Sequence, residues 1–234
     1  MEDYRSLAYA RYTQPVEINY TKYSDSYRRR VASRLSFSPE MRCLDLACGY
    51  GNFLAFLRSA GVVQYMGVDS SRAAVEVAQK EFGTDRIICS DAIEYLKQSP
   101  RKFNLISALD FIEHVTKPEL FNLLRLIANT LEPDGLFLLR TPNANGLFGM
   151  AARYNDIAHE ICFSPGALSD VLARSGLRTI GLWEDTARPG SILQLAHWVA
   201  WQSVRLIVRV VNAAETGGWG DGVLTRNMWL VARK

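Results

Sequence analysis

Short apolar runs alternate along the chain with segments in which apolar residues recur every three or four positions. The apolar runs predict strands over 42–47, 64–69, 86–91, 103–110 and 136–142, and the intervening segments predict helices over 52–60, 71–81, 92–98 and 117–130. Strands separated by helices form parallel sheets that are covered on both faces, with right-handed crossovers. The pattern therefore predicts an α/β fold with a Rossmann-like, mostly parallel, doubly wound sheet.

Two segments flank the alternating region and are expected to cover it. Residues 1–40 are rich in tyrosine and predict a helix over about 20–35, which would form a helical N-terminal cap. After Pro142 an irregular segment leads into a helix over 164–175 that begins at a Ser-Pro pair. We expect 143–175 to form an inserted lid, because long excursions over the carboxyl edge of such sheets carry specificity.

The C-terminal part predicts the last two strands of a seven-stranded sheet, within a domain that covers 41–234. These strands are expected over 177–185 and 224–233, with the final one antiparallel to its predecessor near the sheet edge. Between them, 191–211 predicts a long amphipathic helix with a broad apolar face. Three environments remain open for this helix: the sheet, a second subunit in a homodimer, or the inner membrane as a peripheral contact.

Composition indicates an ordinary globular protein. Of the 234 residues, 48% are hydrophobic and 22% are charged, and the net charge is +3. This mild charge, without a basic cluster along one helix face, gives no indication of nucleic-acid binding. The four cysteines form no C-x-x-C pair and the first residues lack a secretory signal pattern, so we expect reduced, buried thiols in a cytoplasmic protein.

The sequence LDLACGYGNFL leads from the first predicted strand into a helix through a glycine-rich turn. Gly49 and Gly51 permit the backbone to approach a ligand closely. Asp45, inside the strand end, would repel a pyrophosphate but attract a cationic amino-acid ligand. Asp69 ends the next strand, where an acid can bind both ribose hydroxyls, and Asp91 ends the third at a position suited to an adenine amino group.

These segments, together with FNLISALDFIEHV and LEPDGLFLLRTPN, resemble the ordered motifs of the class I S-adenosylmethionine-dependent methyltransferases. The resemblance is strongest over roughly 40–145. It departs once, where Ala47 replaces the usual first glycine of the turn with another small residue. A Rossmann fold that holds a different nucleotide is the alternative, and Asp45 disfavours it.

The resemblance implies that S-adenosylmethionine is the cofactor and that four loops bind it. The implied cofactor-binding residues are Asp45, Ala47, Gly49, Gly51 and Asn52 at the methionine end, Asp69 and Ser70 at the ribose, Asp91 and Ala92 at the adenine, and Leu109 along the cofactor.

The fourth predicted strand is followed by Asp110, Glu113 and His114. If the chain turns into a helix there, the three side chains lie on one face, at the carboxyl edge of the sheet beside the cofactor. His159 in the lid segment is a fourth candidate. Carboxylates and imidazoles that face one way form either a divalent metal site, for Mg, Mn, Fe or Zn, or an acid–base cluster. All four residues are therefore candidate catalytic groups and candidate metal ligands.

This spacing is similar to the E-x-x-E-H pattern of two groups of metal-dependent O-methyltransferases. One group methylates the 3′-terminal 2′-hydroxyl of small RNAs, and the other acts in the ubiquinone pathway. Here Asp110 replaces the first glutamate and has a shorter reach. An aliphatic hydroxyl must lose its proton to accept a methyl group, so a metal or base here indicates an oxygen acceptor. A general base at His114 or His159, and a purely structural role, are the alternatives to a metal.

The sequences ARYNDIAHEICFSPGALSDVLARSGL and LTRNMWLVARK resemble bacterial methyltransferases of surface-polysaccharide and O-antigen (lipopolysaccharide) biosynthesis. The resemblance implies a carbohydrate or lipid-linked glycan acceptor, methylated on a sugar hydroxyl. Two other hypotheses stay open. One is a small-molecule O-methyltransferase for a quinone or phenol, and the other is a non-catalytic cofactor-binding protein that acts through its apolar helix.

Overall fold

The computed structural model describes residues 17–187 and 189–234. These residues contain a seven-stranded sheet in the order β3-β2-β1-β4-β5-β7-β6. The strands are β1 (Arg42–Leu46), β2 (Gln64–Asp69), β3 (Ile87–Cys89), β4 (Phe103–Leu109), β5 (Leu131–Pro142), β6 (Arg178–Glu184) and β7 (Asn227–Arg233). Strands β1 to β5 pair in parallel, whereas β7 is antiparallel to both of its neighbours. The predicted fold class and the antiparallel last strand are confirmed.

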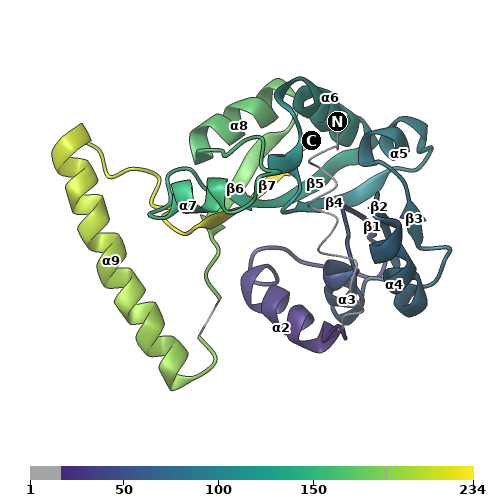
Figure 1. Cartoon of the computed structure of the whole chain (residues 1–234), viewed down its shortest axis with the longest axis horizontal. Helices are drawn as coiled ribbons and strands as arrows, with labels where there is room; N and C mark the ends of the chain where they lie inside the picture. The colour runs from purple at the N-terminus through teal and green to yellow at the C-terminus, as the bar shows by residue number, and fades with distance from the viewer. Residues whose placement is uncertain (1–16, 188) are drawn as a thin grey trace.

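Helices cover both faces of this sheet (Figure 1). On one face are α2 (Tyr20–Arg30), α3 (Asn52–Ser59) and α4 (Arg72–Phe82), and on the other are α5 (Ala92–Gln98), α6 (Lys117–Thr130) and α8 (Pro165–Arg174). Each face has its own cluster of buried apolar side chains, because the central parallel strands present apolar residues on both sides. The short helices η1 (Ile112–His114) and α7 (Gly149–Tyr154) follow β4 and β5.

Several helices begin where the sequence supplies a capping side chain. Asp91 caps α5 by accepting hydrogen bonds from the amides of Ile93 and Glu94 at 2.8 and 3.1 Å. Ser71 caps α4 in the same way, and Ser164 caps α8, which has proline at its first position. These local signals explain why the predicted helix starts agree with the structure to within about a residue.

The described part of the N-terminal cap belongs to the same core as the sheet. Helix α2 ends at Arg30, earlier than predicted. Tyr27 packs edge-on against Phe53 and Trp229, with ring centroids 5.2 and 6.2 Å apart. The Tyr20 hydroxyl donates to the main-chain carbonyl of Tyr50 in the glycine-rich turn, at 2.9 Å. The other predicted cap residues, before residue 17, lie outside the described residues.

The amphipathic helix α9 (Ile192–Thr216) stands apart from the sheet (Figure 1). It is five residues longer at its C-terminal end than the predicted 191–211. None of its 25 residues, all of which belong to the described part of the chain, is buried. Of the three environments left open for this helix, the structure does not support packing on the sheet. No helix among the described residues is long and apolar enough to cross a membrane.

The cysteines only partly meet the expectation of buried thiols. Cys43 and Cys48 are buried, Cys162 is half-buried and Cys89 is exposed, and all four are free. Cys89 is exposed because β3, in which it lies, is a three-residue strand at the edge of the sheet.

Candidate functional site

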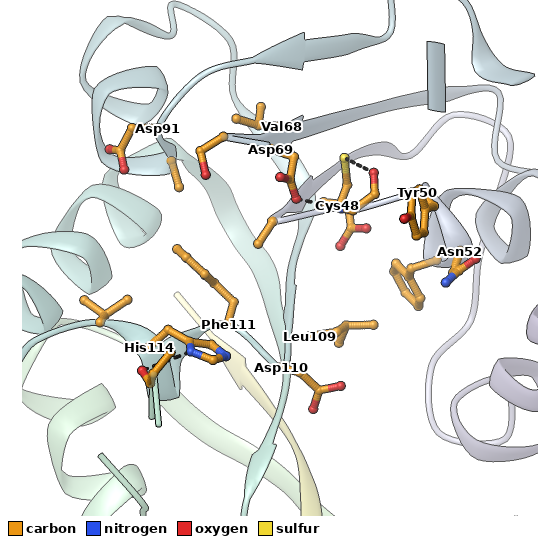
Figure 2. Close-up of a pocket in the computed structure, with 18 of the residues that line it drawn as sticks. Cys48, Tyr50, Asn52, Val68, Asp69, Asp91, Leu109, Asp110, Phe111 and His114 are labelled. Carbon is orange, nitrogen blue, oxygen red and sulfur yellow. Dashed lines mark hydrogen bonds between the residues drawn. The ribbon is translucent and has the colours of Figure 1, made fainter. Parts of the chain in front are cut away.

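A cavity of about 600 Å³ lies at the carboxyl ends of β1, β2 and β4. The strand order reverses between β1 and β4, which is where doubly wound sheets bind ligands. Figure 2 shows side chains from several loops around this cavity. The predicted cofactor residues that line it are Asp45, Ala47, Gly49, Asn52, Asp69, Ser70, Asp91, Ala92 and Leu109. The remaining one, Gly51, is not among the lining residues, so the structure brings nine of the ten together.

The glycine-rich turn follows β1 through three left-handed backbone positions: Ala47 with φ 53°, Gly49 with φ 52° and Gly51 with φ 84°. A Cβ at Gly51 would lie 2.4 Å from the ring of Phe82, so this glycine shapes the turn by close packing behind the cavity. Ala47 is an L-residue in a conformation that costs about 1–2 kcal/mol. Small size is therefore not the only property that the turn requires at this position.

Asp69 joins the turn to the second strand. Its Oδ2 accepts a hydrogen bond from the Gly49 amide at 2.7 Å, and its Oδ1 accepts one from the Ser71 amide at 2.8 Å. A carboxylate has about four lone-pair sites, so capacity remains for ribose hydroxyls in the cavity that Asp69 lines. Burial raises the pKa of Asp69, although both amide bonds favour its ionised form.

Asp45 is buried at the floor of the same region, with 3% of its surface exposed. The Ser107 hydroxyl donates to Asp45 Oδ1 at 2.6 Å. Burial raises the pKa of Asp45 to about 7, and the nearby carboxylate of Asp69 adds to the effect. The buried Oδ1 of Asn52, also in the cavity lining, has no hydrogen-bond partner among the described residues. A cationic amino group and a hydrogen-bond donor would satisfy these groups, which fits the methionine end of S-adenosylmethionine.

Sequence reasoning missed several residues of the cavity wall. Phe111 and Val115 flank the predicted acidic residues, so their position next to the end of β4 could have indicated them. Tyr27 and Phe53 carried no such signal, because they enter the wall through the packing of α2 and α3 against the turn. The lining also includes Cys48, Tyr50, Val68, Ser90, Ile93, Glu119, Asp156 and Ala158.

At the other end of the site, Glu113, His114 and His159 converge. They offer ligand atoms that lie within 4.8 Å of one another, and the two imidazole rings are 4.8 Å apart between centroids. His114 Nδ1 lies 3.1 Å from the Ala158 carbonyl, and His159 Nδ1 lies 3.1 Å from the Ala152 carbonyl. When each Nδ1–H donates to its carbonyl, each Nε2 carries the lone pair, which is the usual arrangement of metal-binding and proton-accepting histidines.

Glu113 is fully enclosed, with 1% of its surface exposed. Its Oε2 accepts a hydrogen bond from the Thr141 hydroxyl at 3.0 Å, and its main-chain carbonyl accepts from the Glu160 amide at 2.7 Å. The second bond joins the segment between α7 and α8 to η1. Burial, followed by the Asp110 carboxylate, raises the pKa of Glu113 to about 8. A divalent cation among the three groups would stabilise the ionised form, so the donor set fits a metal.

Asp110 does not share a helical face with Glu113 and His114, and this prediction is wrong. The Asp110 amide donates to the Arg140 carbonyl of β5 at 2.8 Å, which continues the pairing of β4 with β5 beyond Leu109. Its backbone is left-handed, with φ 54°. Helix η1 begins only at Ile112. The Asp110 carboxylate forms an ion pair with the Arg140 guanidinium. Among the described residues, the group of possible metal ligands therefore holds three of the four predicted side chains, while Asp110 lines the cavity separately.

Arg140, which the sequence did not indicate, borders the site through its ion pair with Asp110. Besides Asp110, it contacts Asp185, to which its Nη2 and Nε donate at 2.7 and 3.0 Å. Asp185 also accepts from Arg30 Nε at 2.9 Å and from Trp229 Nε1 at 2.7 Å. Burial raises the pKa of Asp185, but the two guanidiniums outweigh it and hold the pKa below its usual range. The network joins α2, β5 and β7 to the end of β4.

Comparison with known proteins gives a family and several relatives. A family profile described as a methyltransferase domain matches residues 19–182. A ubiquinone biosynthesis O-methyltransferase of Brucella anthropi is 28% identical over 154 residues, which cover 60% of this chain and 61% of the relative. The cyclopropane-fatty-acyl-phospholipid synthase of Escherichia coli K12 is 28% identical over 114 residues, covering 48% and 29%. A ubiquinone biosynthesis O-methyltransferase of Neisseria meningitidis serogroup C is 25% identical, covering 44% and 45%, so the chain spans about half or less of the length of two of these relatives.

Solved structures show the same fold. A SAM-dependent methyltransferase from Archaeoglobus fulgidus superimposes with a TM-score of 0.67 at 22% identity, covering 99% of this chain and 100% of that one. The mitomycin 7-O-methyltransferase MmcR has a TM-score of 0.60 at 13% identity, covering 92% and 53%. The family profile gives a methyltransferase domain, and these neighbours share its fold.

Proposed function

The chain belongs to the methyltransferase-domain family, and we propose that it is an S-adenosylmethionine-dependent O-methyltransferase. One observation carries the oxygen specificity. The imidazoles of His114 and His159 line the cavity that holds the cofactor motifs, and the buried carboxylate of Glu113 lies close to both. Carbon and nitrogen nucleophiles need little help with proton removal, whereas an aliphatic hydroxyl requires it.

The proposed reaction is an in-line displacement at the methyl carbon of the sulfonium. A carbon–oxygen bond forms to the acceptor while the carbon–sulfur bond breaks, which yields a methyl ether and S-adenosylhomocysteine. The hydroxyl proton leaves the acceptor, and the Nε2 of His114 or His159 would accept it; the carbonyl beside each Nδ1 supports this role. The acidic and aromatic walls then act by positioning the two substrates, which supplies much of the acceleration.

As the alternative to this general-base role, Glu113, His114 and His159 would hold a divalent cation, namely Mg, Mn, Fe or Zn, because a lone pair that binds a metal cannot also accept a proton. The mixed oxygen and nitrogen set, the two carbonyls behind the imidazoles and the raised pKa of Glu113 all support this assignment. When bound, such an ion supplies Lewis acidity that lowers the pKa of a hydroxyl beside it.

For the acceptor, we propose a sugar hydroxyl of a bacterial surface glycan or of its lipid-linked precursor. The acceptor side of the cavity carries polar side chains from three segments, namely Asp110, Glu119 and Asp156, each exposed or half-buried. A polyhydroxylated ring can hydrogen-bond to several carboxylates at once. A sugar also has adjacent hydroxyls, so that one oxygen could accept the methyl group while the site binds the neighbouring one.

A quinone or phenol is the second candidate acceptor, because two of the relatives are named as ubiquinone biosynthesis O-methyltransferases. Leu109, Phe111 and Val115 would provide an apolar wall for a planar ring. A non-catalytic role is disfavoured, because the acidic and glycine motifs lie together around one cavity.

An acceptor screen tests the proposal directly. The protein would be incubated with methyl-labelled cofactor and with glycan, nucleotide-sugar and quinone pools, and the products would be analysed by mass spectrometry. We expect label on a sugar hydroxyl. Label on a phenol alone would replace the glycan proposal, and S-adenosylhomocysteine binding without transfer to any pool would favour the non-catalytic alternative.

Removal of divalent cations is expected to abolish transfer and to leave S-adenosylhomocysteine binding intact, because the candidate ligands lie at the acceptor end. Glu113→Gln and His159→Ala should each lower turnover by roughly 100-fold or more. His197→Ala is the matched control, since this histidine lies on exposed α9. Full activity after exhaustive chelation, with loss in the histidine variant, would assign a general base in place of a metal.

A further inference from the structure

Helix α9 presents its apolar half outward. Successive residues of an α-helix are about 100° apart, so the eight most exposed aliphatic side chains of α9 fall within one half of its circumference. They are between 49% and 89% exposed: Ile192, Leu193, Leu195, Val199, Leu206, Ile207, Val210 and Val211. Ser203 is the single side chain with a hydrogen-bonding group on this half of α9, all of which is described.

The polar half of α9 faces its own chain. Trp201 Nε1 donates to the Glu184 carboxylate of β6 at 3.3 Å, and Arg205 Nε lies 3.2 Å from the same group. Further along, Asn212 Nδ2 donates to the Gly218 carbonyl at 2.6 Å. These contacts fix the rotation of the helix about its axis. Its orientation is the reverse of that of a surface helix in a globular protein, which turns its apolar side inward.

The size and chemistry of this apolar half favour a lipid surface over a second copy of the chain. A helix of 25 residues is about 37 Å long, and half of its circumference offers roughly 600 Å². Each partner of a standard protein interface contributes about 800 Å², with regular hydrogen bonds that set the register. An interfacial helix needs neither, because its apolar half is immersed at the boundary between headgroups and acyl chains.

A basic groove lies directly beside α9 and supplies matching charge. It has a volume of about 480 Å³ and includes Trp198 and Gln202 of the helix. Four arginines line it against two acidic side chains: Arg29, Arg30, Arg34 and Arg205 against Glu184 and Asp221. Arg30 and Arg205 form ion pairs, whereas Arg29 and Arg34 form none with a described residue. The surplus positive charge suits the phosphates of anionic lipids, and a tryptophan between groove and apolar half suits the membrane interface.

We infer that α9 lies on an anionic lipid bilayer, with its apolar half in the acyl boundary and the groove against the headgroups. Helix α7 of the lid lies on the side of the sheet from which α9 projects (Figure 1). Its Met150 and Tyr154 are each 71% exposed. The inference rests on the helix and the groove and does not depend on the acceptor.

Flotation with vesicles tests the inference on the full chain. The protein is expected to float with vesicles of phosphatidylglycerol and phosphatidylethanolamine, and much less with phosphatidylcholine alone. The double variant Leu206→Glu, Ile207→Glu should lower vesicle binding roughly tenfold or more, since it places two charges in the apolar half. Val63→Glu is the matched control, because Val63 is 58% exposed outside α9 and the groove.

Arg29→Glu should weaken binding to the anionic vesicles without changing the apolar half. All variants should bind S-adenosylhomocysteine normally, since none of the substituted residues lines the cofactor cavity. A protein that stays unbound to anionic vesicles would overturn the inference. If light scattering then showed a dimer that the double variant converts to a monomer, a second copy would be the occupant of α9. Methyl transfer to a water-soluble acceptor, measured without vesicles, keeps this outcome separate from the proposed function.

Discussion

At the scale of single residues, Ala47 carries backbone strain within the turn that follows β1. Its φ of 53° lies in the left-handed region, where an L-residue is disfavoured and glycine is not. Ala47→Gly should therefore raise the free energy of unfolding by about 0.5–1 kcal/mol, after allowance for the greater entropy of glycine in the unfolded chain. Urea denaturation monitored by circular dichroism measures the difference.

Ala55→Gly provides the opposite control, because Ala55 lies inside α3 in a right-handed conformation. There the same substitution should lower the free energy of unfolding by about 1 kcal/mol or more. Destabilisation by both substitutions would show that the turn is not strained at Ala47.

The raised pKa of Asp45 predicts how cofactor binding depends on pH. A cationic amino group favours the ionised carboxylate, so binding must release a proton below the pKa of about 7. Affinity for S-adenosylhomocysteine should rise by up to about tenfold per pH unit as pH increases toward 7, and then level off. Isothermal titration in buffers of different ionisation heat measures both affinity and proton release.

The variant Asp45→Asn tests whether this carboxyl carries the effect. It should bind more weakly and lose the pH dependence in that window. In the wild-type protein without cofactor, the raised pKa of Asp45 affects the free energy of unfolding, and its pH dependence has the opposite sign to that of cofactor affinity. Stability should fall as pH rises from about 4 to about 7, because the folded state retains a proton that the unfolded state has released. Proton release that persists in the variant would contradict the role of Asp45.

At the scale of elements, the carboxylate of Asp185 joins helix α2 to strands β5 and β7 by accepting hydrogen bonds from a side chain of each. Asp185→Asn should lower the free energy of unfolding by about 2–4 kcal/mol at pH 7, because it leaves the Arg30 guanidinium beside a neutral amide and Arg140 with Asp110 as its remaining anionic partner among the described residues. The folded-state pKa of Asp185 is lowered, so this contribution is complete above the unfolded pKa of about 3.9 and is lost as pH falls below it. Denaturation at several pH values gives the profile.

The exposed pair of Lys97 and Glu94 is the comparison, since both side chains are about half exposed. Glu94→Gln should change stability by no more than about 0.5 kcal/mol. Equal effects of Glu94→Gln and Asp185→Asn would show that the network adds no more than a surface ion pair.

The elements themselves could be predicted well because their signals are local. Helices α5 and α6 have the predicted bounds, and the strands carry their acids to one edge because parallel neighbours end together. The direction of Asp110 could not be predicted, since it depends on Arg140, 30 positions away. His159 could be predicted only as a residue of a segment that folds over the site, near His114. The contacts of the two imidazoles with the carbonyls of Ala152 and Ala158 had no sequence signal.

At the scale of the whole molecule, the amphipathic pattern of 191–211 predicted a helix but not the direction in which its apolar half points. That direction depends on which partner the polar half finds. Here the partners are Glu184 and the carbonyls of the glycine-rich segment after α9, of which Gly217 is left-handed and ends the helix. The periodicity of the sequence shows that a helix has an apolar half and a polar half. Tertiary contacts decide which of the two halves faces outward.

The antiparallel pairing of β6 and β7 has a consequence for how this molecule can vary. Glu184 pairs with Met228 in the ladder, so the chain departs from the sheet and returns to it at the same place. Everything between, α9 included, is topologically the loop of a β-hairpin, whose length the sheet does not restrict. Asp185 and Val223, near the two ends of this loop, still contact the core, whereas α9 between them contributes no residue to the lining of the cofactor cavity. Replacement of α9 by another segment is therefore expected to leave the cofactor residues in place.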